Sequence, residues 1–400
     1  MQRLLVQMRL GAWLNPDCIT KYATILFAFE LAMFGFFVAG THGLVVSLSG
    51  PATTDFVSFY GAGSLTNAGT PFLAYDRIAH HAAEQRATQP GIGYNYFYYP
   101  PPFLLICAIL ARLPYLAAFF TFQAVTMGGC LLAVRAILPH VRMICLLAFP
   151  AVFWTLGTGQ NAFLSACLFA SGTLLVDRRP VLAGLALGAL CYKPHFGVLI
   201  PVALVAGGHW RVLAGAAAST AAITGLSIAL FGWETWHAFL LAAAKSQSVY
   251  TTHSIDLAGL ASPFGATLVL GGGVSLAYVI QGLVTLMVSI AVGFAWKRNV
   301  SLPARAAILI AATPLAIPVV MFYDLMLVGV AMAWLVRAGW TGGFPPWHRT
   351  ALGVVFLMPL LSGNLDGDSK LLIAPLTALG GFALAFSQVR YEQSSQFSSK

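Results

Sequence analysis

Apolar and polar stretches alternate along the whole chain, and the apolar stretches are its strongest structural signal. The first covers residues 22–46 and is long enough to cross a bilayer as a helix. Further apolar segments cover 99–113, 115–137, 143–158, 161–176, 181–206, 212–231, 273–296, 302–320, 324–337, 350–363 and 371–388. Several are shorter than the roughly 20 residues of a spanning helix, so the pattern predicts short or re-entrant helices among the full spans.

The composition strengthens this interpretation, because 59% hydrophobic and 8% charged residues describe a chain surrounded mainly by lipid. We therefore expect one all-α domain over residues 1–400, that is, a polytopic helical membrane protein. Cytoplasmic Lys and Arg account for the net charge of +9, so no nucleic-acid partner is expected. The six cysteines stand singly, which indicates neither a disulfide framework nor a metal site.

The distribution of Lys and Arg sets the expected topology. Most of them fall on one side if 99–113 is a partial helix and 181–206 is a hairpin bent at Lys193 and Pro194. The asymmetry is weaker if both segments cross once, so we adopt the first arrangement. It predicts an inner (plasma) membrane protein with both termini in the cytoplasm. Five polar regions then face outward, into the periplasm: 47–98, 159–161, 232–272, 322–324 and 364–370.

The first outer loop, 47–98, is predicted to contain two surface helices, 55–68 and 75–88. The second helix is amphipathic, with a polar face formed by Asp76, His80 and Glu84 and an apolar face formed by Ile78, Ala79, Ala82 and Ala83. An aromatic run at 94–99 and a proline run at 100–102 follow, and they mark the return of the chain to the membrane.

Acid–base chemistry at the outer face depends on few carboxylates, because the chain has only 12 acidic residues. Most of the outward ones are interpreted as solvated or turn-forming residues, namely Asp76, Glu84, Glu234, Asp366 and Asp368. This leaves Asp55, Asp256 and Asp324. Asp55 is the foremost of them, because it stands where the first membrane helix emerges.

Several short motifs occur in a defined order along the chain: Asp55-Phe56 with Phe59-Tyr60, Gly69 and Tyr75, 97–101, Gly159-Gln160-Asn161, and Gly184 through Gly188 to Lys193-Pro194. Together they resemble glycosyltransferase family 87, over most of the chain. The resemblance implies a GT-C-type fold and an enzyme that depends on polyprenyl phosphate sugars. The best-known members are α-1,2-mannosyltransferases that act on glycolipids.

The resemblance further implies an inverting transfer, most often of mannose, from a polyprenyl phosphate to a hydroxyl of a glycolipid or polysaccharide acceptor at the outer face. One general base suffices, because the phosphate leaves without a proton. In the family this base begins the first outer loop, which corresponds to Asp55. The alternative is that Asp55 only caps the helix beginning at Phe56. No cofactor or metal is implied, since the sugar donor is a substrate.

The donor phosphate requires cations or hydrogen-bond donors near the membrane interface. Lys193 is the leading candidate, because a lysine in an apolar hairpin is costly without a partner, although snorkelling to lipid headgroups is an equal alternative. His195 follows it. The other candidate substrate contacts are Gln160, Asn161, Tyr323, Asp324, Lys245 and His253. Helix capping is an equal alternative for Gln160 and Asn161, whereas Asp324 is open to sugar binding, pairing with Lys193 or capping.

Two other classes of protein handle lipid-linked sugars at the same place. A transporter or flippase forms no glycosidic bond and often has inverted repeats, which are not visible in this chain. An O-antigen polymerase or ligase usually has its large polar loop late in the chain, whereas the long loop here comes first. In every case the expected partners are the lipid-linked sugar, its acceptor and membrane lipids.

Overall fold

The structure, a computed structural model, describes residues 2–40, 54–245, 257, 259–362 and 372–398. These residues form helices joined by turns and contain no β-strand beyond one isolated bridge, which confirms the all-α prediction. Within them, five helices are long and apolar enough to cross a membrane: α2 (Pro16–Gly40), α6 (Tyr115–Ile137), α12 (Trp210–Lys245), α15 (Val274–Lys297) and α17 (Met326–Gly342) with its preceding turn η5 (Phe322–Leu325). The chain is therefore a multi-pass membrane protein.

The remaining helices of the body are mostly shorter: α1 (Gln2–Leu10), α5 (Leu104–Leu110), α7 (Met143–Leu147), α8 (Pro150–Thr158), α9 (Ala162–Leu175), α14 (Pro263–Val269), α16 (Leu302–Ala316), α18 (His348–Leu357) and α19 (Ile373–Ser398). Proline explains one of the breaks. Pro150 begins α8 and has no N–H to continue α7, so the predicted segment 143–158 is divided in two. The predicted segment 99–113 contains the 3-10 turn η2 (Pro101–Phe103) and the seven-residue α5, as expected of a partial helix.

The segment 181–206 is a hairpin, as predicted. Its arms are α10 (Pro180–Gly188) and α11 (Leu199–Ala206), and two 3-10 turns join them, η3 (Ala189–Tyr192) and η4 (Pro194–Gly197). Val176 and Pro180, before and at the start of α10, line one pocket with residues 208–212, which follow α11, so the chain enters and leaves the hairpin at the same end. Lys193 lies at the tip, where φ −137° and ψ 65° are outside the helical region because Pro194 follows it.

Helix α12 packs directly against α10. A Cβ atom at Gly184 or Gly188 would collide with carbonyl oxygens of α12, which explains the glycine pair. Gly232 interrupts α12 with φ 76°, at the boundary predicted between the apolar segment and the loop 232–272. The helix then continues to Lys245, so the loop 232–272 begins with helical residues.

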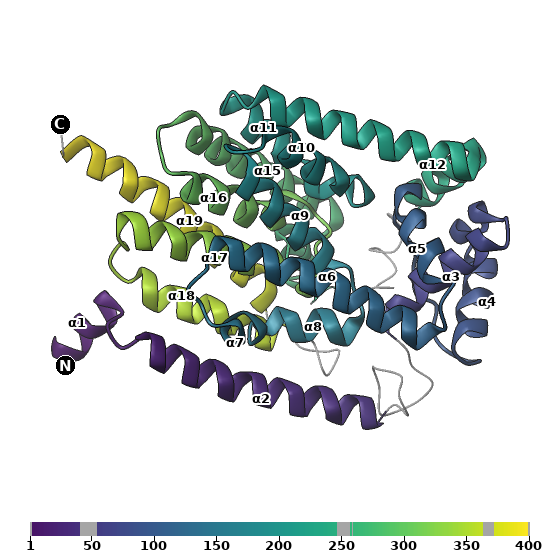
Figure 1. Cartoon of the computed structure of the whole chain (residues 1–400), viewed down its shortest axis with the longest axis horizontal. Coiled ribbons are helices and arrows are strands. Elements are labelled where there is room, and N and C mark those ends of the chain that lie inside the picture. The colour runs from purple at the N-terminus through teal and green to yellow at the C-terminus, as the bar shows by residue number, and fades with distance from the viewer. Residues whose placement is uncertain (1, 41–53, 246–256, 258, 363–371, 399–400) are drawn as a thin grey trace.

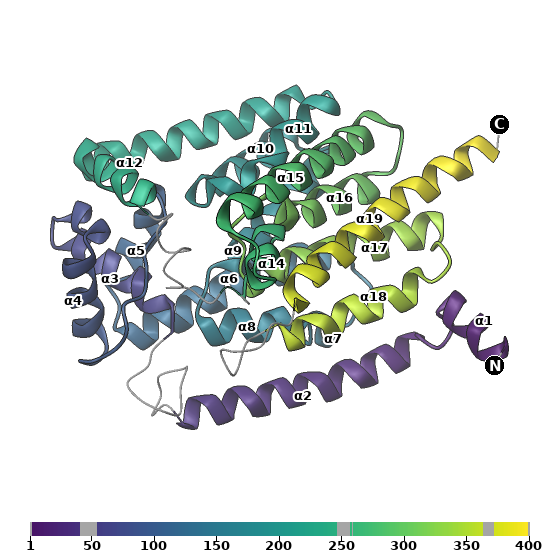
Figure 2. The ribbon, with the colours of Figure 1, turned by 180° about the vertical axis from the view of Figure 1, so that it is seen from behind.

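Figures 1 and 2 show both termini at one end of the molecule and the helices α3 (Phe56–Asn67), α4 (Arg77–Ala87) and α5 at the opposite end. Helix α16 lies in the interior, and nearly all of its side chains are buried. The polar residues that concern function gather where α3, the α8–α9 turn, the hairpin tip and η5 meet.

Candidate active site

Asp55 lies immediately before α3, and hydrogen bonds to its backbone fix its position. Its N–H donates to the carbonyl of Thr158 at the end of α8 (2.9 Å), and its own carbonyl accepts from the Ser58 hydroxyl (2.9 Å). The carboxylate makes no hydrogen bond to the N–H groups of α3. The capping alternative is therefore not realised, and the half-buried carboxylate is directed away from the helix backbone.

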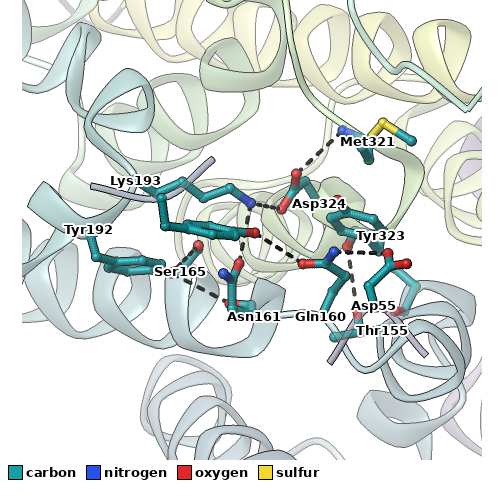
Figure 3. Close-up of polar contacts among 12 residues, drawn as sticks. Asp55, Thr155, Gln160, Asn161, Ser165, Tyr192, Lys193, Met321, Tyr323 and Asp324 are labelled. Atoms are coloured by element: carbon teal, nitrogen blue, oxygen red, sulfur yellow. Dashed lines mark hydrogen bonds and ion pairs between the residues drawn. The ribbon is translucent and has the colours of Figure 1, made fainter. Parts of the chain in front are cut away.

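The Gln160 side chain connects Asp55 to Tyr99. Its Nε2 donates to Asp55 Oδ2 at 2.9 Å (Figure 3). Its Oε1 accepts from the Tyr99 hydroxyl at 3.2 Å. Because the phenol donates to Oε1, the amide nitrogen is the end that faces Asp55. Gly159 makes the turn that presents Gln160, with φ 71° and no room for a Cβ beside Phe56.

Lys193 forms a buried ion pair with Asp324, 2.7 Å from Nζ to Oδ1. Its Nζ also donates to Asn161 Oδ1 at 3.4 Å and lies 4.4 Å from the ring centroid of Phe196. Asp324 Oδ2 accepts from the Met321 N–H at 3.4 Å. Of the alternatives for Lys193 and Asp324, pairing is the one the geometry realises. Snorkelling is not, because Lys193 is only 5% exposed.

Two hydrogen-bonding groups of this cluster have spare capacity. The Lys193 ammonium has three N–H donors, and two of them point at Asp324 and Asn161. The Asn161 side chain is fully buried and does not cap α9, and its Nδ2 has no hydrogen-bond partner among the described residues. Buried donors without partners are rare, because they lose hydration without compensation. The geometry therefore leaves donors available to an anionic or hydroxyl-bearing ligand.

Burial and hydrogen bonding act in opposite directions on Asp55. Burial raises the pKa of its carboxyl above the usual value, and the hydrogen bond from Gln160 opposes that rise. A carboxylate with a raised pKa is a stronger base, which suits it to accept a proton from a hydroxyl group.

The structure brings six of the predicted residues into one cluster: Asp55, Gln160, Asn161, Lys193, Tyr323 and Asp324. Tyr323 contributes a ring 5.7 Å from Lys193 Nζ, and its carbonyl accepts from Thr155. His195 packs edge-on against Phe196 and forms no hydrogen bond with the described residues of this cluster. Lys245 is exposed, at the end of α12. His253 and Asp256 lie outside the described residues.

Three residues of the network had no predicted role in it. Tyr99 belongs to the aromatic run 94–99, which was interpreted as a membrane-interface belt. Tyr192 and Ser165 share a 2.6 Å hydrogen bond beside Asn161, and Tyr192 lies in an apolar segment. Their positions in the sequence could have indicated a role for two of them, because Tyr99 directly precedes the proline run and Tyr192 directly precedes Lys193.

The helix predicted at 75–88 is present as α4, but the prediction of which of its side chains face solvent was wrong. His80 and Glu84, expected on a solvated face, are fully buried against α3, whereas Ile78 of the expected apolar face is 83% exposed. The reason is that Gly61 lets α4 approach α3 closely, so that its Cα faces Glu84 and His80. The polar side chains then satisfy backbone groups: His80 Nε2 donates to the Ser58 carbonyl (2.9 Å), and Glu84 Oε2 accepts from the Asn95 N–H (3.2 Å).

The buried side chains of His80 and Glu84 lead to the prediction that Glu84→Gln stabilises the protein at alkaline pH. His80 Nδ1 and Glu84 Oε1 lie 3.7 Å apart, and within the part of the chain that the structure describes neither atom has a hydrogen-bond partner. Burial raises the pKa of Glu84 from 4.5 to about 8, so the contribution of this carboxyl to stability falls as pH rises from about 4.5 through 8. Burial lowers the pKa of His80 from 6.5 to about 4, which opposes that fall up to about pH 6.5; above this pH only the effect of Glu84 remains. A Gln amide would donate to Nδ1 and still accept from Asn95.

We expect Glu84→Gln to melt at higher temperature than wild type at pH 8.5, by the equivalent of about 1–3 kcal/mol. Its melting temperature should also be nearly independent of pH between about 6.5 and 8.5, because the amide does not titrate. Thermal unfolding in detergent measures both, and Glu234→Gln, which changes an exposed carboxylate, is the matched control. Equal pH dependence in Glu84→Gln and wild type would contradict the interpretation.

The site combines the half-buried Asp55 carboxylate, which Gln160 orients, with the buried Lys193 ammonium and the Asn161 amide. In a multi-pass helical protein, these are the features of a membrane transferase site. The model of glycosyltransferase family 87 matches residues 97–320 of the chain, which belongs to that family. The matched region includes Tyr99, Gln160 and Lys193, whereas Asp55 and Asp324 lie outside it. The chain matches no curated protein and no solved structure.

Among the described residues, no group of three or more His, Cys, Asp or Glu side chains is arranged to hold a metal ion.

Proposed function

We propose that this glycosyltransferase is an inverting enzyme that transfers a sugar from a polyprenyl phosphate donor to a hydroxyl of a glycolipid or polysaccharide acceptor. The family resemblance makes mannose the proposed sugar. The observation that carries the proposal is the Asp55 carboxylate, fixed by Gln160 in the same buried cluster as Lys193. Membership of the family favours a transferase over a transporter or flippase.

In the proposed reaction, Asp55 accepts the proton of the acceptor hydroxyl while the hydroxyl oxygen attacks the anomeric carbon. The new glycosidic bond forms as the bond from that carbon to the phosphate oxygen breaks. The electron pair leaves with the polyprenyl phosphate, whose added charge is stabilised by the third N–H of Lys193 and by Asn161 Nδ2. Gln160 holds one carboxylate oxygen, which leaves Oδ1 for the hydroxyl.

The same proposal places the reaction at the outer face of an inner membrane. The polar cluster lies toward the end of the molecule opposite both termini, and the positive-inside rule assigns the termini to the cytoplasm.

The direct test is to reconstitute the purified protein in liposomes with polyprenyl phosphate mannose and with candidate glycolipid acceptors. Formation of a mannosylated glycolipid with the α configuration from a β-linked donor supports the proposal. If the protein transfers other sugars from polyprenyl phosphate but not mannose, the proposed sugar is wrong and the proposed mechanism stands. Movement of labelled donor across the bilayer without a new glycosidic product would contradict the proposed function.

Replacing Gln160 tests whether its hydrogen bond sets the pKa of Asp55. In Gln160→Leu the hydrogen bond that lowers the pKa of Asp55 is lost, so that pKa rises further. Because the base acts only when ionised, the acid side of the pH–rate profile is expected to move to higher pH. The transfer rate between about pH 5 and 9 measures this shift. Tyr99→Phe, which frees the amide to turn over, should shift the profile in the same direction but less, and an unchanged profile in both variants would exclude this role.

A further inference from the structure

A long apolar groove runs along α2, beside its contacts with α7 and α8. Figure 1 shows α2 along one edge of the body, and few of its side chains are buried. The groove has a volume of about 1100 Å³ and lies between α2 on one side and α6, α8, α17 and α18 on the other. Apolar cavities of this kind do not hold ordered water, because water finds no hydrogen-bond partners there.

The length of the groove matches one lipid chain. Along α17 it extends from Met326 to Trp340, which is roughly 21 Å at the rise of an α-helix. One leaflet of a bilayer contributes about 15 Å of hydrocarbon, so a chain in this groove reaches from the membrane surface slightly beyond the midplane. The deep end is lined by Met326, two residues after Asp324. A molecule that fills the groove therefore contacts the first residue of α17, next to the active site.

Only one end of the groove is charged. His140, Arg142 and Arg349 line it there, all three are exposed, and no Asp or Glu belongs to the lining. The ion pairs among the described residues involve none of these three side chains. Thr350, beside Arg349, donates to the carbonyl of Met8 in α1, so the charged end lies with the termini and away from the cluster around Asp55.

We infer that this groove binds an anionic phospholipid, with an acyl chain between α2 and α17 and the headgroup phosphate at Arg142 and Arg349. A phosphate compensates cations that lack acidic partners, and a net-anionic headgroup is favoured over a zwitterionic one because it introduces no opposing cation. The acyl chain fills the space between α2 and the body. This lipid is neither sugar donor nor acceptor, so the inference does not depend on the proposed function.

The inference is tested on purified, delipidated full-length protein to which phosphatidylglycerol or phosphatidylcholine is added back. Native mass spectrometry measures how much lipid stays bound, and thermal unfolding measures the stabilisation. We expect wild type to retain phosphatidylglycerol preferentially and to melt at higher temperature with it. In Arg142→Gln/Arg349→Gln the affinity is expected to fall roughly fivefold for each arginine removed.

Two further variants separate charge from shape. Arg298→Gln removes an exposed cation outside the groove and should bind phosphatidylglycerol like wild type. Val354→Trp enlarges an exposed side chain at the groove wall, so it should expel the lipid while every cation remains. Equal retention of both phospholipids, or full retention in the double Arg variant, would overturn the inference. Competitive displacement of phosphatidylglycerol by polyprenyl phosphate would overturn it too, because the groove would then belong to the donor.

Discussion

Asp55→Asn is expected to lower the rate of sugar transfer by about 10²- to 10⁴-fold, the usual contribution of a general base. Asparagine preserves the shape of the side chain and can still hydrogen-bond to Gln160, so the fold should be retained. The amide, however, cannot take the proton of the acceptor hydroxyl. We expect the loss in kcat, with little change in the KM for the donor, because Asp55 acts on the acceptor in the transition state. Initial rates with saturating acceptor measure it.

Glu234→Gln is the matched control, because it neutralises an exposed carboxylate on the surface helix at the end of α12. It should transfer sugar at the wild-type rate. Asp55→Glu offers a second comparison, since it keeps a carboxylate but displaces it by one methylene group, and partial activity is expected. Full turnover by Asp55→Asn would exclude Asp55 as the base and leave Asp324 as the only candidate among the described, predicted acids.

Lys193→Met is expected to have the second large effect, on stability as well as activity. It removes the partner of Asp324, which is 2% exposed and would be left as an uncompensated buried charge. Breaking a buried pair in this way costs about 3–5 kcal/mol. The melting temperature in detergent should fall strongly, and transfer should be lost with it. Lys297→Met, which removes an exposed cation at the end of α15, should change neither property.

The double variant Lys193→Met/Asp324→Asn separates the two roles of Lys193. It contains no buried charge at this place, and the amide oxygen that replaces the carboxylate can still accept from the Met321 N–H, so most of the stability should return. If Lys193 also binds the donor phosphate, transfer stays low and the KM for the donor stays high. A double variant with wild-type stability and wild-type KM would show that the ammonium serves only to compensate Asp324.

Much of the fold was predictable because lipid imposes a simple rule on sequence. Every spanning segment must be apolar and must satisfy its own backbone hydrogen bonds, so helices are readable from hydropathy alone. The bend at Lys193 and Pro194 was predictable for a similar reason, since proline restricts the residue before it. The break before Pro150 was missed, because the apolar run continues across it unchanged.

For the helix α4, the pattern of apolar and polar residues did not predict which side chains are buried. Its pattern of apolar and polar residues predicted an exposed His80 and Glu84, yet both are buried and Ile78 is exposed. In an aqueous protein the apolar face of such a helix would pack inward. Here the neighbour is α3, whose Gly61 and Ser58 offer a close approach and a carbonyl acceptor, so polar groups are the better complement. The properties of a partner helix cannot be read from the pattern of one helix.

The sequence by itself determined the class of the protein, the positions of its apolar helices and a short list of residues with suitable chemistry, because these depend on composition and local spacing. Only the tertiary structure decided which of those residues meet. Asp55 and Gln160 are 105 positions apart, and Lys193 and Asp324 are 131 apart. Their contacts result from the packing of α3, the α8–α9 turn, the hairpin tip and η5. Chain order does not determine that packing, since it depends on how buried surfaces fit together.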